Sequence, residues 1–321
     1  MIDYSSFKNY LKYEKKYSEN TLIAYTKDID QFLEFVLQNY TEVPKYLDSQ
    51  HVIFHITHRE VRSWMADLMQ KKLSRRSINR KLSSVSAFYR FYKRMGIAQY
   101  NPVEKITFPA IEKKIPVFIP ESDIKFLLDE VEFGDDFEGL RDRVILELLY
   151  GCGLRISECT NLLVSHIYLE KRELKVLGKG KKERIIPFNE MVALSLQKYL
   201  LRRAEILSTH GVHTNYLFIR KNGLPAYTKL IYRAVKHYLT HLGNFTKTNP
   251  HVLRHTFATH LLNQGADIYT IKTLLGHSSL NATQIYTHNS IDQLKKAFHN
   301  FHPRACKDKS TPQNKDSGGS F

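Results

Sequence analysis

The segment NPHVLRHTFATHLLNQG, residues 249–265, decides the interpretation of this chain. Asn249 is a typical N-cap, a proline suits the first helical position and Gly265 suits a helix stop, so the segment predicts one helix. His251 and Arg254 lie three residues apart, on one face of its first turn. Because a helix N-terminus attracts anions, this pair predicts a phosphate-sized binding site; a capped core helix with incidental polar residues remains the alternative.

The same helix carries histidines that resemble a metal site by spacing alone. His251, His255 and His260 follow one another at helical intervals, and His277 comes later. Zinc-binding helices of metalloproteases also need a glutamate, whereas here the cationic Arg254 lies between two of the candidate ligands. We therefore predict no metal ion here.

Two segments on the N-terminal side of this helix add further cations. In GCGLRISECTNL, residues 151–162, a glycine-rich break is followed by Arg155 and, three residues on, Glu158. Such a pair usually lies on the surface, but Arg155 and Arg254 together would present two planar guanidinium groups to one phosphate. ELKVLGKGKKERIIPF, residues 173–188, predicts a β-hairpin with Lys179 at its turn. A lone lysine in a turn is otherwise a solvated side chain.

A last segment, LLGHSSLNATQIYTH, spans residues 274–288. It predicts a helix that ends at Gly276, with His277 at the turn and Tyr286 on a short following helix. A single tyrosine is usually a core residue, and the chain contains 19 tyrosines, so Tyr286 is not decisive by itself.

Composition indicates an anionic partner. The 321 residues carry a net charge of +16, and 42% of them are hydrophobic, enough for two domains with cores. Residues 71–94 contain nine basic and no acidic residues. A solvated face normally mixes signs, so we predict DNA contacts there. The residues predicted to bind DNA are Lys71, Lys72, Arg75, Arg76, Arg80 and Lys81.

The chain divides into regions of different character. Helical periodicity fills residues 1–107, with an apolar stripe over residues 22–36 and helix starts predicted at Thr57 and near Ser74. A proline-containing linker covers 108–119, and helices with the β-hairpin follow over 120–305. The polar segment 306–321 predicts disorder. The three cysteines form no CxxC pair, which suits a reducing cytoplasm. The sequence shows no signal peptide and no long apolar run, so we predict a soluble cytoplasmic protein.

Five motifs, taken in order, resemble the signature of the tyrosine recombinases. They are Gly-x-Gly-Leu-Arg-x-Ser-Glu (151–158), Gly-Lys-Gly-x-Lys-Glu-Arg (178–184), His-x-Leu-Arg-His (251–255), Leu-Gly-His (275–277) and Ile-Tyr-Thr-His (285–288). The match is closest to the Xer branch, which resolves chromosome dimers in bacteria, and it extends over about residues 5–305. The resemblance implies a two-domain clamp: a helical DNA core-binding domain, and a mainly α catalytic domain with a small antiparallel sheet.

The resemblance also implies a set of residue roles. Arg155 and Arg254 would bind the scissile phosphate, Lys179 would protonate the departing 5′ oxygen, and Tyr286 would be the nucleophile. His251 and His277 would hydrogen-bond the phosphate and assist proton transfer, with Glu158 and His255 supporting them. No metal, ATP or other cofactor is implied.

The implied partner is double-stranded DNA at a specific, palindromic-like site such as dif. The family would form a dimer per site and a tetramer in synapsis, with segment 291–302 packed on a neighbouring protomer or folded back in cis, and a DNA translocase as an activator. A longer interval near residues 39–57 and the tail after Arg304 leave two assemblies open, a single-recombinase homotetramer and a two-recombinase pair. The alternatives are an integrase of a mobile element, a type IB topoisomerase and a catalytically silent DNA-binding factor.

Overall fold

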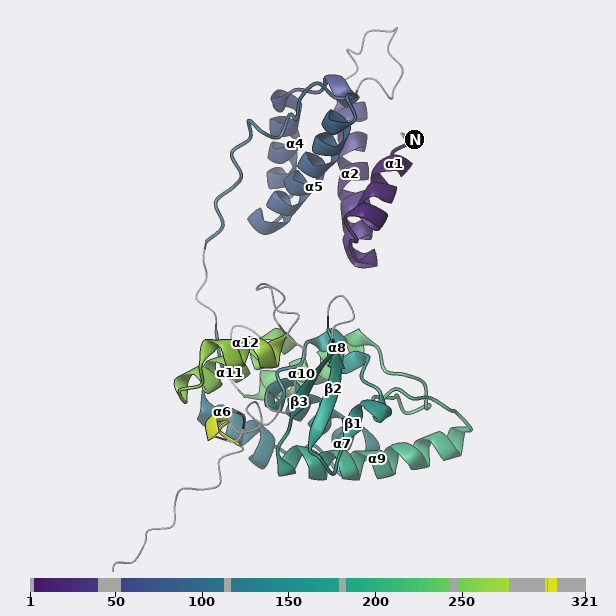
Figure 1. Cartoon of the computed structure of the whole chain (residues 1–321), viewed down its shortest axis with the longest axis vertical. Coiled ribbons are helices and arrows are strands. Elements are labelled where there is room, and N and C mark those ends of the chain that lie inside the picture. Colours follow the sequence, from purple (N-terminus) through teal and green to yellow (C-terminus); the bar gives the residue numbers. More distant parts are fainter. Residues whose placement is uncertain are drawn as a thin grey trace, which may run out of the picture. The chain divides into compact units, whose positions relative to one another are not determined.

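The computed structural model divides into two compact units, residues 1–114 and 115–321 (Figure 1). It describes residues 3–39, 53–112, 117–178, 183–242, 248–276, 298 and 300–304. Each unit has its own hydrophobic core. Within these residues, no helix is both long and apolar enough to cross a membrane.

Among the described residues of the N-terminal unit, the regular elements are all helices joined by turns and loops. Its helices are α1 (Ser5–Asn9), which continues as the π-helical turn η1 (Tyr10–Glu14), α2 (Glu19–Asn39), the 3-10 turn η2 (Ile53–His55), α4 (His58–Gln70) and α5 (Arg75–Arg94). α2, α4 and α5 contact one another, as Figure 1 shows. The apolar stripe predicted for α2 lies inward: Ile29, Phe32 and Val36 are buried, and the ring of Phe32 contacts that of Trp64.

Local hydrogen bonds define where two of these helices begin. The Thr57 hydroxyl accepts from the backbone N–H of Arg59, and the Glu60 carboxylate accepts from the backbone N–H of Thr57 at 2.7 Å. The Ser74 hydroxyl accepts from the backbone N–H of Ser77 at 3.2 Å. These contacts satisfy N–H groups that a helix leaves unpaired at its start, and they confirm both predicted starts.

The C-terminal unit contains one small antiparallel sheet surrounded by helices. Its elements are α6 (Glu121–Lys125), η3 (Phe126–Glu130), α7 (Phe137–Gly151), α8 (Ile156–Thr160), η4 (Val164–His166), β1 (Ile167–Tyr168), β2 (Glu173–Leu177), β3 (Glu183–Pro187), α9 (Glu190–His210), α10 (Thr228–His241), α11 (Pro250–Asn263) and α12 (Ile268–Leu275). Helix α7 is buried on almost all sides and contacts α9, α10 and α11. The predicted fold class is confirmed: mainly α, with a small antiparallel sheet.

The sheet has the order β1-β2-β3, with Leu174 opposite Ile186 in the β2–β3 pair. Both side chains are buried, and so is Val176, because alternate residues of each strand face the helices. The pair confirms the predicted hairpin. The short strand β1, which pairs with β2, was not predicted, since two residues are too few to show an alternating pattern.

The described end of the chain folds back onto its own unit. Phe298 is fully buried in the core of the C-terminal unit, and its ring stacks on His302 at 4.7 Å between centroids. Arg304 forms an ion pair with Asp129 at 2.8 Å, and its carbonyl oxygen accepts from Asn189. Of the two predicted arrangements of segment 291–302, the described residues show the fold-back in cis for Phe298 and Phe301, and packing on a neighbouring protomer stays a prediction. The rest of that segment lies outside the described residues.

Candidate active site

Arg155 is positioned by the break between α7 and α8. Gly153 has a φ of +58°, a backbone conformation that favours glycine, and it turns the chain so that Arg155 becomes the N-cap of α8. A Cβ at Gly153 would lie 2.6 Å from the ring of Phe257, so close packing also requires glycine here. The side chain of Arg155 remains 31% exposed.

Arg254 lies on α11 and extends to this break between α7 and α8. Its side chain is buried, and it donates to the carbonyl oxygens of Gly153 at 2.5 Å and of Leu275 at 2.6 Å. Burial, followed by the charge of Arg155, lowers the pKa of Arg254 to about 10. The group therefore remains a cation at neutral pH.

Glu158 is the acceptor on which the arginines converge. Its carboxylate accepts from Nη1 of Arg155 at 2.7 Å and from the backbone N–H of Arg155 at 2.8 Å, and it lies 3.7 Å from Nη1 of Arg254. Burial alone would raise the pKa of Glu158, but hydrogen bonds and charge from Arg184, and then from Arg155, bring it below its usual value. Arg155 and Arg254 thus share one anion already.

Arg184 is the residue that sequence reasoning missed. It lies on β3, is 5% exposed, and binds both oxygens of Glu158 at 2.9 and 2.8 Å. The available signal was its position two residues before Ile186, which places an arginine on the buried face of a strand. A buried charge needs a partner, and this one is paired across the sheet edge with α8.

A cavity of about 450 Å³ opens beside Arg155. It is bordered by α8, by the end of β2 and by the end of α12. Its lining residues are Arg155, Ser157, Glu158, Asn161, Leu162, His166, Val176, Leu177, Gly178 and Gly276. Three arginines against one glutamate give this region a positive balance, which suits an anion.

The structure describes only some of the remaining predicted site residues. His251 is exposed on the first turn of α11, and His255 is half-buried one turn later. Lys179, His277 and Tyr286 lie outside the described residues. Of the candidate zinc ligands, His260 is buried and hydrogen-bonded to the Tyr150 hydroxyl at 3.0 Å; the described residues contain no group of three metal-ligating side chains.

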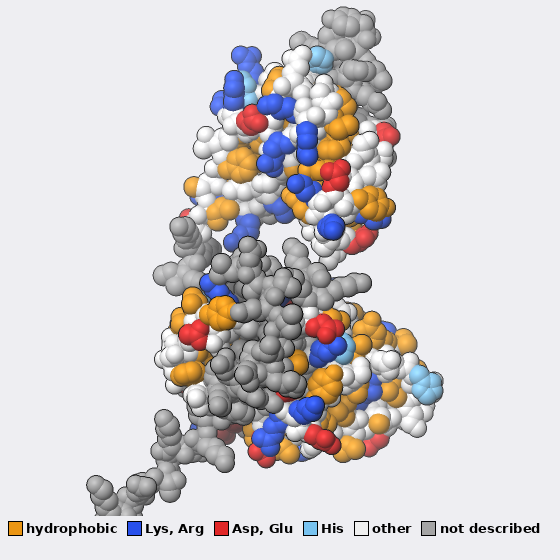
Figure 2. All heavy atoms as spheres, in the orientation of Figure 1, with side chains coloured by type: hydrophobic (Ala, Val, Ile, Leu, Met, Phe, Trp, Pro, Cys, Tyr) orange, Lys and Arg blue, Asp and Glu red, His pale blue; other side chains and the backbone are white. Residues whose placement is uncertain are grey.

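The basic segment of the N-terminal unit is largely exposed, with one exception. Lys71, Lys72, Arg75, Arg76 and Arg80 are exposed, and Figure 2 shows Lys and Arg side chains over the visible face of this unit. Lys81 is only 6% exposed; it donates to Asp28 at 3.0 Å and also to Gln31. The prediction that Lys81 binds DNA is therefore corrected, because its ammonium neutralises a buried carboxylate.

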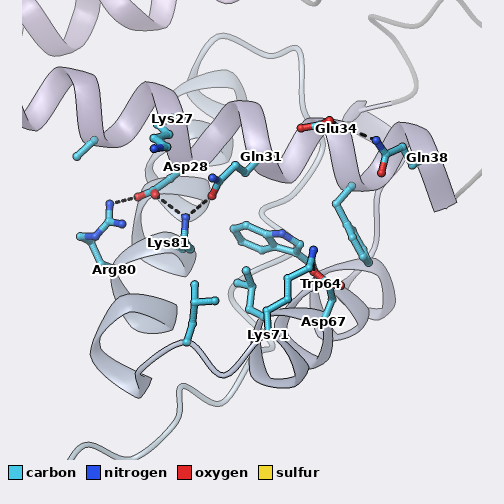
Figure 3. Close-up of a pocket in the computed structure, with 14 residues that line it drawn as sticks. Lys27, Asp28, Gln31, Glu34, Gln38, Trp64, Asp67, Lys71, Arg80 and Lys81 are labelled. Atoms are coloured by element: carbon cyan, nitrogen blue, oxygen red, sulfur yellow. Dashed lines mark hydrogen bonds and ion pairs between the residues drawn. The ribbon is translucent and has the colours of Figure 1, made fainter.

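Figure 3 shows these groups around a cavity of about 650 Å³ between α2, α4 and α5. Arg80 also contacts Asp28 with one guanidinium nitrogen, while its side chain remains 47% exposed. At the other end of the cavity Lys71 pairs with Asp67 at 2.8 Å on the surface of α4. Charges of both signs line this cavity, and Lys71 and Arg80 belong both to its lining and to the exposed basic residues.

Two family models match the chain. The phage integrase family matches residues 118–292, and the phage integrase N-terminal SAM-like domain matches residues 5–96. Tyrosine recombinase XerC of Chlorobaculum tepidum is 38% identical over 315 residues, covering 92% of this chain and 93% of that protein. The XerC of Staphylococcus saprophyticus is also 38% identical, with coverages of 93% and 96%.

Solved structures share the fold at lower identity. The XerH recombinase bound to difH substrate has a TM-score of 0.64 and 18% identity, covering 94% of this chain and 82% of that one. The Tn1549 transposon integrase in complex with transposon right end DNA has a TM-score of 0.63 and 21% identity, with coverages of 91% and 98%.

The chain belongs to the phage integrase family, on the Xer branch of the tyrosine recombinases. It is an enzyme of site-specific DNA recombination, and the prediction made from the five ordered motifs is confirmed at this level.

Proposed function

We propose that this recombinase cuts one strand of its DNA site by attack of Tyr286 on a phosphodiester held by Arg155 and Arg254. The observation that supports it is the convergence of the two arginines, from motifs far apart in sequence, on the Glu158 carboxylate. Two guanidinium groups that meet at one carboxylate are spaced to meet at a phosphate, which presents similar acceptor oxygens.

The other roles are those that the tyrosine recombinase motifs imply. Gly178 and Gly276 line the cavity beside Arg155, and each directly precedes a predicted catalytic residue, Lys179 or His277. We assign Lys179 to protonation of the 5′ oxygen, and His277 and His251 to phosphate hydrogen bonds and proton transfer.

The chemistry that these groups support is a reversible transesterification. A phenol has a pKa near 10 and needs help to attack at neutral pH, and the guanidinium groups stabilise the charge that develops on the phosphate. Losing one such contact should cost about 3–4 kcal/mol. The product is a 3′-phosphotyrosine and a free 5′ hydroxyl. Because the bond energy is conserved, the 5′ hydroxyl of a partner strand reverses the reaction and yields strand exchange.

The proposal extends to the DNA and the assembly. We assign the exposed basic residues of α5 and its N-terminal turn to the backbone of double-stranded DNA at a palindromic-like site, in the cytoplasm. Two protomers per site and four in synapsis would exchange strands through a Holliday junction, with a DNA translocase as activator. Relatives named XerC at 38% identity favour resolution of chromosome dimers at a dif-like site over integration of a mobile element.

Covalent trapping tests the nucleophile and identifies the DNA site in the same experiment. The protein is incubated with nicked fragments of its host genome, and protein-linked DNA is isolated under denaturing conditions and sequenced. Wild type and Tyr232→Phe, a change of an exposed tyrosine on α10, should both yield adducts at one recurring sequence. Tyr286→Phe should yield none, and an adduct with that variant means that another residue is the nucleophile.

The recovered site then separates the related activities. Plasmids with two copies of the site should give exchanged products with this protein alone if it acts as a homotetramer. A strict requirement for a second recombinase refutes the single-recombinase form. Relaxation of any supercoiled plasmid without exchange indicates a topoisomerase, and binding without a covalent adduct indicates a silent DNA-binding factor.

A further inference from the structure

Arg184 is a buried cation that the roles above leave unused. Its Nη1 and Nη2 bind the two oxygens of Glu158, and its Nε donates to the carbonyl oxygen of Leu274 at 2.9 Å. All three nitrogens of the guanidinium therefore donate to protein acceptors. A side chain engaged in this way, and 5% exposed, acts on other protein groups and not on a phosphate.

The first group that Arg184 fixes is the support of Arg155. Glu158 accepts from the side chain and the backbone N–H of Arg155, and it accepts from Arg184 with the same two oxygens. A carboxylate held by a planar two-point fork cannot rotate without losing both hydrogen bonds. Arg184 therefore sets the direction in which Glu158 holds the Arg155 guanidinium.

The second group is the end of α12. The last carbonyl oxygens of a helix lack internal partners and carry partial negative charge. Here three arginines donate to three consecutive carbonyl oxygens at the end of α12. Arg184 donates to the carbonyl of Leu274, Arg254 to that of Leu275 at 2.6 Å, and Arg155 to that of Gly276 at 3.3 Å.

Gly276 makes the packing on this helix end tight. It has a φ of +63° and ends α12 in the left-handed conformation, and a Cβ there would lie 3.1 Å from Cδ of Arg184. The Arg184 side chain thus lies directly against the residue from which the chain continues to His277. A shift of Arg184 would displace the start of the segment that carries the predicted histidine and Tyr286.

We propose that Arg184 is a positioning residue of the recombinase: it aligns Arg155 through Glu158 and fixes the end of α12 ahead of His277, without touching DNA itself. The inference rests on the proposed function, in which Arg155 binds the scissile phosphate. Its consequence is specific. Removing Arg184 should slow strand cleavage while leaving the affinity for DNA unchanged.

The test compares Arg184→Met and Arg184→Lys with changes at a matched buried arginine. Arg203 on α9 is 7% exposed and donates to the carbonyl oxygens of Thr214, Tyr216 and Leu217, which are not among the residues of the site. Single-turnover formation of the covalent adduct is measured at saturating DNA on the trapped site, and the DNA dissociation constant is measured separately.

We expect Arg184→Met to lower the cleavage rate about 10- to 100-fold, as a misplacement of about 1 Å does, with a dissociation constant within about twofold of wild type. Arg184→Lys should recover part of the rate, since an ammonium supplies charge but not the two-point fork. Arg203→Met and Arg203→Lys should cleave within about threefold of wild type. A wild-type rate in Arg184→Met, or a loss of affinity equal to the loss of rate in both Arg184 variants, overturns the proposal.

A double-mutant comparison shows whether Arg184 acts through Glu158. If it does, Arg184→Met should slow a Glu158→Gln protein less than it slows wild type, because only the contact with the end of α12 remains to be lost. Fully multiplied effects would show that Arg184 does not act through Glu158 and overturn the proposal. Wild type and Tyr286→Phe are run in parallel. Absence of any adduct with wild type refutes the proposed function itself. A normal wild-type adduct shows that a change in rate is due to the Arg184 substitution.

Discussion

Nη1 of Arg254 donates a hydrogen bond to the carbonyl oxygen of Gly153 at 2.5 Å, which joins α11 to the break between α7 and α8. The other terminal nitrogen of Arg254 holds the end of α12 through Leu275. One buried guanidinium therefore links three segments of the C-terminal unit. Its position depends on Gly153, and Arg155 follows Gly153 by two residues, so the geometry of both predicted phosphate ligands depends on this turn.

Gly153→Ala should destabilise the C-terminal unit by about 2–4 kcal/mol, because a positive φ and a clash with Phe257 add together. Gly211→Ala is the matched control: its φ is +61°, but a Cβ there has nothing within 4 Å, so the loss should be about 1 kcal/mol. Denaturant titrations followed by far-UV circular dichroism measure both. Equal losses in the two variants would show that packing against Phe257 contributes nothing.

Asp28→Ala should destabilise the N-terminal unit by about 3–5 kcal/mol, because it leaves the buried ammonium of Lys81 without its counter-ion. Asp67→Ala removes the exposed pair with Lys71 and should cost less than about 1 kcal/mol. Trp64, the single tryptophan of the chain, lies in this unit, so its fluorescence reports the unfolding. If Asp28→Ala costs no more than Asp67→Ala, Lys81 is not held by this ion pair.

Lys72→Gln and Arg76→Gln should each weaken DNA binding and reduce the slope of log K against log salt by about 0.9, as expected for the loss of one phosphate contact. Both side chains are exposed, and neither has an ion pair among the described residues. Fluorescence anisotropy at several salt concentrations measures the slope. The control is Lys198→Gln, an exposed lysine on α9. Slopes that match wild type in both variants would remove this surface from the DNA interface.

His260 should make the C-terminal unit less stable in mild acid. Burial lowers its pKa, although the charge of Glu121 opposes this. The unfolded chain then binds the proton more readily, so stability is complete above the ordinary histidine value of 6.5 and is lost as pH falls from 6.5 through the lower folded pKa. His260→Asn should show a smaller decline between pH 7.5 and 5.5 in thermal melts. An identical decline in both proteins would assign it to other groups.

Interactions between neighbours along the chain were predictable. The capped starts at Thr57 and Ser74, the glycine stop of α7 and the β2–β3 hairpin involve residues within a few positions of one another, and each was predicted correctly. Arg155, Glu158 and Arg254 were also singled out from their motifs. The structure brings these three together, while their roles in catalysis stay predictions.

Contacts between residues far apart in the sequence were not predictable from the sequence pattern. Lys81 and Arg76 look alike in a run of basic residues, yet Lys81 is paired with Asp28, 53 positions earlier, because α2 and α5 pack there. The sequence left open whether segment 291–302 packs on a neighbouring protomer or folds back, and the structure buries Phe298 in the core of its own unit. In both cases the sequence shows a suitable side chain and does not show which surface meets it.

The sequence by itself determined the family, the helices and hairpin, and the identity of the charged side chains available to bind a phosphate. Only the tertiary structure decided which charged side chains face solvent and which form buried ion pairs with one another. The pair of Arg184 with Glu158 is one of these. The physical reason is that helix caps and turns are set by residues a few positions apart. The burial of a charge depends on the whole surface packed against it.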